Sequence, residues 1–490
     1  MFFISLSFFI FAVYFRIKYL NVNQLSTDEA FHFYYIDLIK KNNNSLPDYN
    51  QNLLGEGPKA CTYPSMYHFI LSYFSIEFLK KYGHLTALFY DILSGILLSL
   101  FLFKFTKIDF SFYFLITGFF LIFPSLIFPA IGPRSFSLTP RNFSQFLWSC
   151  SYLCLLCFLE DQSVFWLQLS AILGALNILS SKFFVQYIIL MSLFVSVFTL
   201  SENGLFFLMN CFVFAALIGR KRLYQQLKGH IEHSWWYIND GIKFIQVRWQ
   251  WRTIYSYIKE LRIRDLWQVV MFQNPLSRGI ILNFPLFLYI IFNDGLSHDL
   301  LTDFSQCIIA GAVFYFILTQ FSYFKAFGEP ERYFEYSLPP FIFIIFYTHP
   351  SFESILFIII YCLIFCAYMF RIRKNNTPDL DNSNTKEAIE FIKRLDKKRI
   401  LCTHNNETYL FATYTDKILI GFFSNNQKGA FYTYFYHIYP EVNTDNFRSL
   451  VMKHEITHII INKKSTIHNL YDVNGFKKIL ENNLYQIYTP

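Results

Sequence analysis

Thr27-Asp28-Glu29-Ala30-Phe31-His32 follows closely on the first apolar run of the chain, residues 2–19. Carboxylates are costly near a membrane and are usually kept there for chemistry or for ion handling. Two adjacent carboxylates stand here near the start of a polar region, residues 20–83, which is too long to be a simple connection between apolar runs. This placement indicates an enzyme that works at a membrane surface.

The composition is that of an integral membrane protein. The 490-residue chain is 54% apolar and only 16% charged, whereas a soluble protein normally has about 25% charged residues. Long apolar runs recur along the chain, and such runs are candidate membrane spans. We therefore predict an all-α polytopic membrane domain with about eleven transmembrane helices. The runs lie near residues 2–19, 84–104, 109–130, 143–159, 164–181, 183–200, 204–219, 279–293, 303–322, 335–348 and 353–370.

Two further polar regions have distinct compositions. Residues 220–278 are rich in aromatic and basic side chains, a mixture that suits helices lying in the lipid headgroup layer. The tail from residue 374 changes sharply to Asn, Asp and Lys. We predict a membrane domain over 1–373, which includes the first polar region, and a small α/β domain over 374–490, whose length is sufficient for one hydrophobic core.

Local patterns place elements within the polar regions. Residues 28–41 and 66–82 have the spacing of amphipathic helices. In the tail, we expect a helix and three short strands, because the helix has amphipathic spacing and the strands are apolar and β-branched or aromatic. The tail helix covers 386–395, and the strands cover 399–403, 456–462 and 485–489.

The charge pattern bears on partners and on orientation. The net charge of +8 is spread over loops, which favours anionic headgroups or phosphates as partners and disfavours nucleic acid, because no basic run is dense enough for it. With a cytoplasmic amino terminus, eleven spans would place the first polar region, residues 220–278 and the tail outside. Residues 220–278 carry eleven Lys and Arg, so the positive-inside tendency favours the opposite orientation.

The acidic pair carries a resemblance to a known class of enzymes. Asp28-Glu29, followed by His32, precedes Cys61-Thr62-Tyr63-Pro64-Ser65-Met66-Tyr67, which leads into a helix. This arrangement resembles the GT-C membrane glycosyltransferases, in particular the loop of the dolichyl-phosphate-glucose and mannose glycosyltransferases. The resemblance implies transfer of a sugar from a polyprenyl-phosphate donor to a lipid, glycan or protein acceptor, at the extracytoplasmic face and with inversion.

The same resemblance suggests roles for the residues of the first polar region. Asp28 would act as general base on the acceptor, since a carboxylate can take the proton of a hydroxyl or an amide. Glu29 would orient the acceptor or a metal ion, and His32 lies one helical turn after Asp28 on the same face. Tyr63 is a substrate-binding candidate. Alternatively, Thr27 or Asp28 caps a helix with acidic residues in its first turn, and His32 is an ordinary interfacial histidine.

A second set of candidates would bind the donor phosphate. Arg332 in Gly328-Glu329-Pro330-Glu331-Arg332-Tyr333 stands where a helix would re-enter the membrane, and it looks like the phosphate-contacting arginine of these transferases. Arginine suits this role because its guanidinium donates two parallel hydrogen bonds to a phosphate. Glu329 and Tyr333 are candidates beside it. The alternative is a structural ion pair of Arg332 with Glu329 or Glu335.

Three other basic residues complete the predicted donor site. Arg141 and Arg134 flank the entrance of the span near 143–159, and Lys182 separates two apolar runs. Relatives in the GT-C class often have a basic residue at the position of Lys182, although a lone lysine between spans is usually a turn residue.

The sequence also bounds cofactors and alternative functions. It contains no metal-ligand cluster of recognisable spacing, so we expect no resident cofactor, with a divalent cation left open. It has no phosphate-cradling glycine loop, which disfavours a sugar nucleotide as direct donor. The alternatives are a transporter or flippase for a lipid-linked glycan and a non-catalytic membrane scaffold. We expect a multi-pass protein of the plasma or inner membrane, or of the endoplasmic reticulum in a eukaryote.

Overall fold

The computed structural model contains two compact units, and each is described by itself. Unit 1 comprises residues 1–21, 82–223 and 234–376, and unit 2 comprises residues 22–81, 224–233 and 377–490. The structure describes residues 2–20, 27–50, 59–106, 109–128, 138–236, 238, 251–292, 299–328, 330–348, 351–375, 383–395, 399–402, 411–412, 415, 418–419, 431–432, 438–439, 447–453, 455–463 and 473–490.

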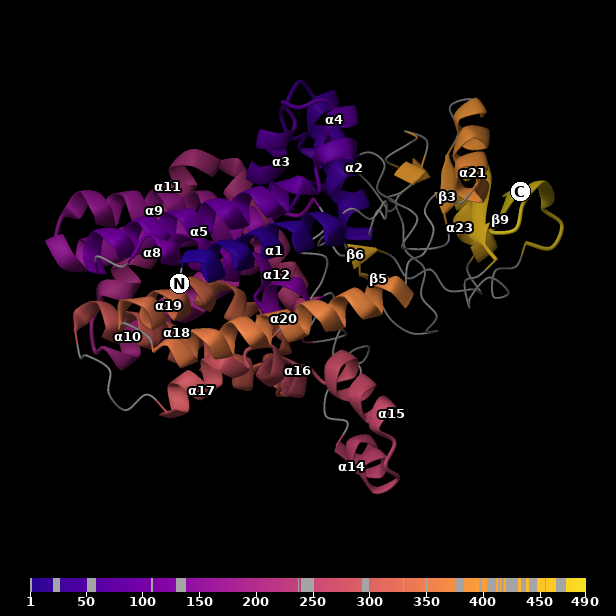
Figure 1. Cartoon of the computed structure of the whole chain (residues 1–490). Coiled ribbons are helices and arrows are strands. Elements are labelled where there is room, and N and C mark those ends of the chain that lie inside the picture. Colours follow the sequence, from indigo (N-terminus) through magenta and orange to yellow (C-terminus); the bar gives the residue numbers. More distant parts are fainter. Residues whose placement is uncertain are drawn as a thin grey trace. The chain divides into compact units, whose positions relative to one another are not determined.

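Unit 1 is helical in all of its described elements, and its helices run side by side in a bundle (Figure 1). Neighbouring pairs pack closely, among them α8 with α9, α1 with α6, α5 with α6 and α18 with α19. Its helices are α1 (Phe2–Leu20), α5 (Leu85–Thr106), α6 (Ser111–Ile122), α7 (Pro124–Ile127), α8 (Pro140–Asp161), α9 (Val164–Ile178), α10 (Lys182–Phe198), α11 (Asn203–Gly219), α14 (Trp251–Lys259), α15 (Ile263–Gln268), η3 (Val269–Gln273), α16 (Pro275–Leu282), α17 (Phe284–Phe292), α18 (Leu300–Leu318), η4 (Ser322–Phe327), α19 (Arg332–Tyr347) and α20 (Phe352–Asn375).

Each of the eleven apolar runs coincides with a helix or with a pair of short helices. Four helices in the described part of the chain are long and apolar enough to cross a membrane, namely α5, α8, α18 and α20. A fifth span results if α11 and α12 (Lys221–Trp236), which meet at a bend of 120°, count as one. The chain thus has the apolar helices of an integral membrane protein, but the number of eleven transmembrane helices is not confirmed.

Local breaks explain why apolar run length overestimates helix length. The run near 109–130 splits at Phe123, which is extended because Pro124 follows it and disfavours a helical conformation before it. The run near 279–293 is likewise divided at Asn283, between α16 and α17. By contrast, α19 continues through Pro339 and Pro340, as neighbouring helices can satisfy the backbone groups that proline leaves open.

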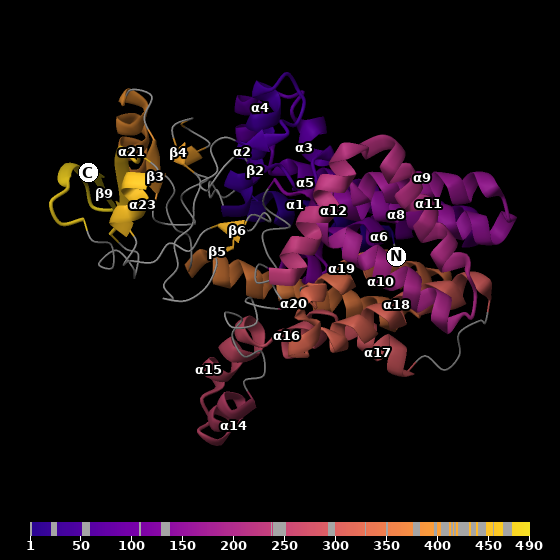
Figure 2. The same cartoon turned by 180° about the vertical axis from the view of Figure 1, so that it is seen from behind.

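Unit 2 combines short helices with a small sheet in the tail, seen from behind in Figure 2. Its five-stranded sheet has the order β4-β3-β7-β9-β8, in which β3 is parallel to β4 and β7, and β9 is antiparallel to β7 and β8. The described elements of this unit are α2 (Thr27–Lys41), β1 (Tyr49–Asn50), β2 (Lys59–Ala60), α3 (Met66–Leu71), α4 (Ile76–Tyr82), α21 (Ser383–Arg394), β3 (Ile400–Cys402), β4 (Ile418–Leu419), β5 (Phe431–Tyr432), β6 (Ile438–Tyr439), α23 (Phe447–Lys453), β7 (His458–Asn462), β8 (Lys477–Glu481) and β9 (Tyr485–Thr489).

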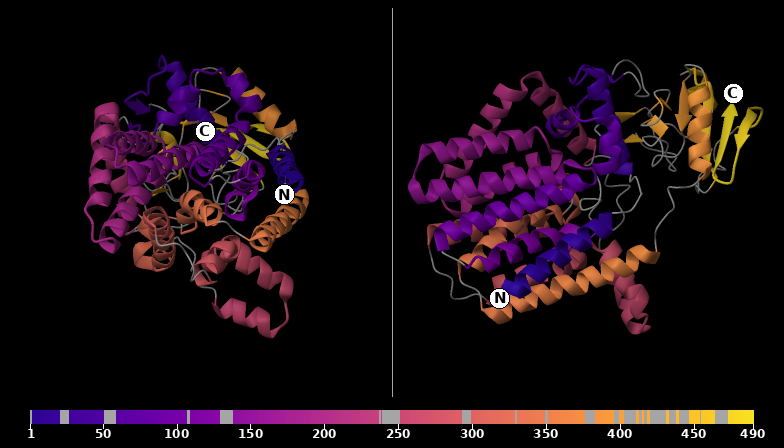
Figure 3. Two further views of the ribbon diagram at one scale, coloured as in Figure 1. Left: turned by 60° about the vertical axis from the view of Figure 1, so that its left-hand side comes forward. Right: turned by 45° about the horizontal axis from the view of Figure 1, so that its top comes forward.

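The predicted helix and three strands of the tail are confirmed within a few residues as α21, β3, β7 and β9. Figure 3 shows α21 beside this sheet, and buried side chains of both, such as Ile392 and Ile460, belong to one cluster. The same cluster includes Phe31 and Tyr35 of α2. Unit 2 therefore joins the first polar region to the tail, and independent folding of residues 374–490 stays a prediction.

Candidate functional site

The acidic pair lies at the start of a helix. Because α2 begins at Thr27, Asp28 and Glu29 belong to its first turn, where the helix dipole favours negative charge. The side chains of Thr27 and Asp28 lie outside the described part of the structure. Glu29 is buried, as is His32 in the next turn. The helix thus carries the catalytic candidates of the first polar region on adjacent turns.

His32 contacts a second histidine that the sequence analysis missed. Its Nδ1 lies 2.8 Å from Nε2 of His68 in α3, so one of these two nitrogens donates a hydrogen bond to the other. The two rings stack with 5.0 Å between their centroids. Both side chains are buried. The only available signal was the position of His68 directly after the Cys61–Tyr67 stretch.

Burial keeps this histidine pair neutral. Loss of solvation lowers the pKa of His68 to about 3, and the nearby carbonyl of Pro64 opposes this change only partly. Loss of solvation also lowers the pKa of His32 well below its ordinary value, and the charge of a protonated His68 would lower it further. A neutral pair can share one proton in a hydrogen bond, but it is a poor site for a charged imidazolium.

Aromatic rings surround the histidine pair. The ring of Tyr63 lies 5.6 Å from His68 and 6.0 Å from His32, measured between centroids. The hydroxyl of Tyr35 donates to the carbonyl of Tyr63 at 3.1 Å, and Phe31 stacks on Tyr35. Tyr63 thus holds the segment before α3 against α2, next to His32, and its role in substrate binding stays a prediction.

In unit 1, Arg332 is the first residue of α19 and lies over an aromatic ring. Its guanidinium carbon is 5.6 Å from the centroid of Phe183, a cation–π distance. Lys182 directly precedes Phe183 in the sequence and is the first residue of α10. Tyr333 is fully buried, and its hydroxyl donates to the carbonyl of Phe327 at 2.8 Å. The structure therefore brings Arg332, Lys182 and Tyr333 to one corner of unit 1.

The segment before α19 is fitted closely to α10. The side-chain amide of Gln186 donates to the carbonyl of Ala326 at 2.9 Å. Gly328 has a φ of 95°, which favours glycine, and a Cβ on it would lie 2.7 Å from Cε2 of Phe183. Glycine at this position lets the chain pass Phe183 and turn into the helix that carries Arg332.

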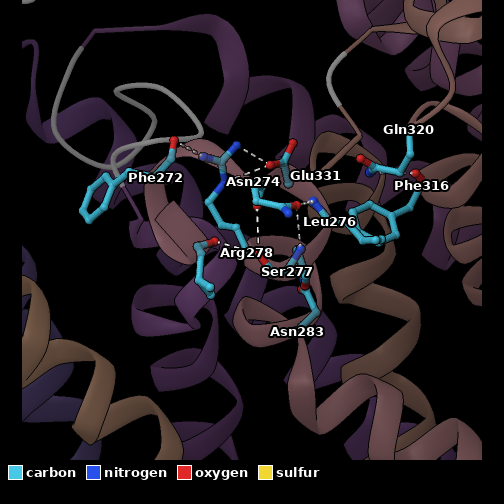
Figure 4. Close-up of polar contacts among 11 residues, drawn as sticks. Phe272, Asn274, Leu276, Ser277, Arg278, Asn283, Phe316, Gln320 and Glu331 are labelled. Atoms are coloured by element: carbon cyan, nitrogen blue, oxygen red, sulfur yellow. Dashed lines mark hydrogen bonds and ion pairs between the residues drawn. The ribbon is translucent and has the colours of Figure 1, made fainter. Parts of the chain in front are cut away.

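Glu331, directly before Arg332, is held by a buried arginine (Figure 4). Nε of Arg278 donates to Oε1 of Glu331 at 2.8 Å, and Nη2 donates to the same oxygen. Nη1 of Arg278 donates to the carbonyl of Phe272 at 3.2 Å. Asn274, at the start of α16, accepts hydrogen bonds from the backbone amides of Leu276 and Ser277 at 3.0 and 3.3 Å. This network fixes α16 to the start of α19.

Arg141 forms an ion pair with Glu335, the residue that the sequence analysis gave as an alternative partner of Arg332. Nη2 of Arg141 donates to Oε1 of Glu335, and both side chains are largely buried. Gln145 donates to the backbone carbonyl of Glu335 at 2.6 Å. The predicted neighbours Arg134 and Glu329 lie outside the described residues. Arg141 thus links the starts of α8 and α19.

A third buried ion pair joins α1 to α5. Nη1 of Arg16 lies 2.9 Å from Oδ2 of Asp91 and donates to the carbonyl of Leu121 at 2.7 Å. Asn142 donates to both oxygens of Asp91 at 2.9 Å. Arg16 is near the end of α1, whereas Asp91 and Asn142 are near the starts of α5 and α8. These three ion pairs thus lie toward helix ends, whereas buried hydroxyl groups such as those of Ser151 and Ser170 bond to one another farther along the helices.

Among the described residues, no group of three or more His, Cys, Asp or Glu side chains could hold a metal ion. The histidine pair does not fit a metal site as it stands, because each ring directs a nitrogen at the other. The first candidate set also contains the carboxylates of Asp28 and Glu29, whereas the second consists of aromatic and cationic groups.

The sequence matches no protein-family model and no curated protein. In structure, the chain is similar to the oligosaccharyltransferase of Archaeoglobus fulgidus solved with Zn and sulfate, with a TM-score of 0.54, 10% identity, and coverage of 93% of this chain and 68% of that one. The same enzyme tethered to an acceptor peptide has a TM-score of 0.48 and 11% identity, over 94% of this chain and 69% of the other.

A third structure of that enzyme, with an inhibitory peptide and a dolichol-phosphate, has a TM-score of 0.47 and 10% identity over the same shares of the two chains. The fold assignment rests on the first of these likenesses. It extends over nearly the whole chain, so the membrane helices and the tail are both included. The expected resemblance to the GT-C class is confirmed at the level of the fold, which this chain has in common with an archaeal oligosaccharyltransferase.

Proposed function

We propose that this protein is a GT-C glycosyltransferase that transfers a sugar from a polyprenyl-phosphate-linked donor to a lipid, glycan or protein acceptor at the extracytoplasmic membrane face. The observation that carries the proposal is the fold in common with the Archaeoglobus oligosaccharyltransferase over 93% of the chain. The acidic pair at the start of α2 adds chemical support. Identity of the sugar and of the acceptor is left to experiment.

The proposed reaction is a single displacement with inversion. Asp28 takes the proton of the acceptor hydroxyl or amide, whose oxygen or nitrogen forms a bond to the anomeric carbon. The bond from that carbon to the phosphate oxygen breaks, and the lipid phosphate leaves with its electrons. Glu29 orients the acceptor or a divalent cation. The neutral His32–His68 pair holds α2 against the segment of Tyr63.

Arg332 is proposed to bind the donor phosphate. Its guanidinium lies over the ring of Phe183, which follows Lys182 at the start of α10, and a guanidinium can both stack on an aromatic face and bind a phosphate in a bidentate manner. Arg141 is a weaker candidate, because Glu335 already neutralises much of its charge. Tyr333 supports the corner through its bond to Phe327.

The test of the proposed function is sugar transfer by purified protein in lipid, with a panel of polyprenyl-phosphate sugars as donors. We expect Asp28→Asn to abolish transfer while the protein still folds. The matched control is Asp37→Asn on the same helix, a partly exposed carboxylate that pairs with Lys41 at 2.8 Å, and this variant should keep its activity. A chelator added to the wild type separates a metal-assisted role of Glu29 from direct contact with the acceptor.

Near-normal transfer by Asp28→Asn would remove Asp28 as the base. Absence of transfer by the wild type from every donor of the panel would remove the enzymatic proposal and favour a glycan transporter or a scaffold. A transporter normally places ionisable side chains near the centre of several spans. The three buried ion pairs lie toward helix ends instead, which supports surface chemistry.

A further inference from the structure

Two short helices project from the rest of unit 1. In Figures 1 and 2, α14 and α15 extend away from the bundle as a hairpin, here the α14–α15 hairpin, residues 251–268. The chain turns between them at Leu261, whose φ of 51° is in the left-handed region. Residues with side chains adopt this conformation at a cost, so the turn is a defined feature of the hairpin.

The hairpin exposes large apolar side chains. Leu261 is 81% exposed, Ile263 75% and Tyr255 70%, and Ile258 and Trp267 are also exposed. Single exposed apolar residues are common on proteins, but five within one short hairpin form a patch of the kind that marks an interaction surface. Water is therefore an unfavourable environment for this surface.

Basic side chains border the apolar ones. With 3.6 residues per turn, Arg252, Tyr255, Ile258 and Lys259 follow one another on one face of α14. Arg264 follows Ile263 at the start of α15. In the described part of the chain, no carboxylate lies within ion-pair distance of any of these three basic residues. A surface that is apolar in the middle and cationic at its border is complementary to an anionic lipid surface.

A neighbouring arginine differs from these three. Nε of Arg262 donates to Oδ2 of Asp265 at 2.7 Å, and Glu260 lies 3.7 Å from its Nη1. Two carboxylates thus offset the charge of Arg262. The net positive charge of the hairpin therefore comes from Arg252, Lys259 and Arg264.

The base of the hairpin is fixed at the end of a candidate membrane span. Nε1 of Trp267 donates to the hydroxyl of Tyr368 at 2.6 Å, and Tyr368 is close to the end of the apolar part of α20, Phe352–Arg371. Trp and Tyr are enriched at this depth of a membrane protein. Arg278 binds the carbonyl of Phe272 just after the hairpin (Figure 4). The contact with Tyr368 thus sets the base of the hairpin beside the end of this candidate span, where lipid headgroups are expected.

We propose that the α14–α15 hairpin is a membrane-surface anchor that binds anionic phospholipid headgroups through Arg252, Lys259 and Arg264 and buries its apolar side chains at the boundary with the acyl chains. This role is independent of the proposed glycosyl transfer. The hairpin leads through η3 into α16, whose Arg278 holds Glu331 beside Arg332. Lipid binding would thereby help to hold α16, and through Arg278 the start of α19 with Arg332, in place.

The test uses the full chain in lipid nanodiscs with or without phosphatidylglycerol. A fluorophore is attached to Ile258→Cys in a background in which the half-buried Cys150, Cys157 and Cys307 are serine. Quenching by a nitroxide at headgroup depth is compared with quenching by aqueous iodide. A variant with Gln in place of Arg252, Lys259 and Arg264 removes the basic border, and a charge-matched control has Gln in place of the exposed Lys393, Arg399 and Lys477 of unit 2.

In anionic nanodiscs we expect strong quenching by the lipid nitroxide and protection from iodide. The preference for anionic lipid should fall by about fivefold for each basic residue removed, and raised salt should have the same effect, since it screens exposed charges. The control variant should behave as the wild type. Equal lipid quenching in both kinds of nanodisc would overturn the anionic-lipid assignment. Full access of iodide, or protection that appears only when two copies share a nanodisc, would overturn membrane anchoring.

Discussion

The two units hold their buried polar groups in different ways. In unit 1, buried arginines pair with carboxylates, as Arg16 does with Asp91 and Arg278 with Glu331. In unit 2, the buried polar centre is a pair of histidines without charge, enclosed by aromatic rings. The buried arginines of unit 1 are thus matched with carboxylates, whereas the buried histidine pair of unit 2 is neutral.

The arginines of unit 1 also differ from one another in their surroundings. Arg16 and Arg278 are buried with a carboxylate, but Arg332 is only partly buried and lies over Phe183. An arginine that stacks on an aromatic face can still bind a phosphate in a bidentate manner. The following predictions test this distinction, from the largest expected effect to the smallest.

The buried ion pairs should dominate the stability of unit 1. Arg16→Met leaves Asp91 as an uncompensated buried charge, which typically costs about 3–5 kcal/mol of unfolding free energy. Lys18→Met, which removes an exposed cation two residues later on the same helix, is the matched control. Thermal unfolding in detergent measures both. The double variant Arg16→Met/Asp91→Leu should regain part of the loss. Equal melting temperatures for the two single variants would show that the Arg16 pair is not structural.

Arg332 should affect donor use more than stability. A hydrogen bond to a charged group contributes roughly 1.5–3 kcal/mol, so Arg332→Ala should weaken donor use by about one to two orders of magnitude. Arg332→Lys should recover only part, because lysine keeps the charge and loses the fork. The exposed Arg371 of α20 provides the control substitution. Donor-dependence kinetics and a melting curve of each variant distinguish a role in donor binding from a role in stability. An unchanged donor response with a lowered melting temperature would make Arg332 structural.

The histidine pair should make unit 2 sensitive to acid. The pKa of folded His68 is lowered to about 3, and the unfolded chain takes up a proton near pH 6.5. Stability is therefore constant above pH 6.5 and falls as the pH drops toward 3, by up to about 1.4 kcal/mol per pH unit for this residue. The expected loss at pH 5 is about 2 kcal/mol.

Limited proteolysis of α2 and α3 between pH 5 and 7.5 measures this effect. A double variant, His32→Leu/His68→Leu, has no histidine to protonate at this position, so its digestion should lose most of the pH dependence. A wild type with the same digestion rate at both ends of this range would contradict the buried neutral pair.

Apolar run length and local patterning located the apolar helices of unit 1 and, in the tail, α21, β3, β7 and β9, whereas β4, β5, β6, β8 and α23 were not predicted. Run length could not reveal where a helix breaks, because the split at Phe123 depends on the conformation that Pro124 imposes. The sheet order was also beyond a single sequence, since β3 pairs with β7 across more than fifty residues and only tertiary packing selects that partner.

The sequence was sufficient to predict which charged residues stand at helix starts, but not which side chains they contact. The acidic start of α2 and the basic residues at the starts of α8, α10 and α19 follow from their positions between apolar runs. The ion-pair partners could not be predicted in this way, because the packing of α8 against α19 brings Arg141 and Glu335 together. His68 was missed for the same reason, since its contact with His32 exists only once α3 packs on α2.

The pair between Arg16 and Asp91 has a consequence for biosynthesis. A lone arginine in a membrane helix costs about 2.5–3.5 kcal/mol at the helix centre and less near its end. Asp91 is made about 75 residues after Arg16, which at ribosomal rates takes roughly 4–15 seconds. During that interval α1 carries a charge without its partner. We therefore predict that α1 stays close to the insertion machinery until α5 emerges, so that the two helices enter the bilayer together.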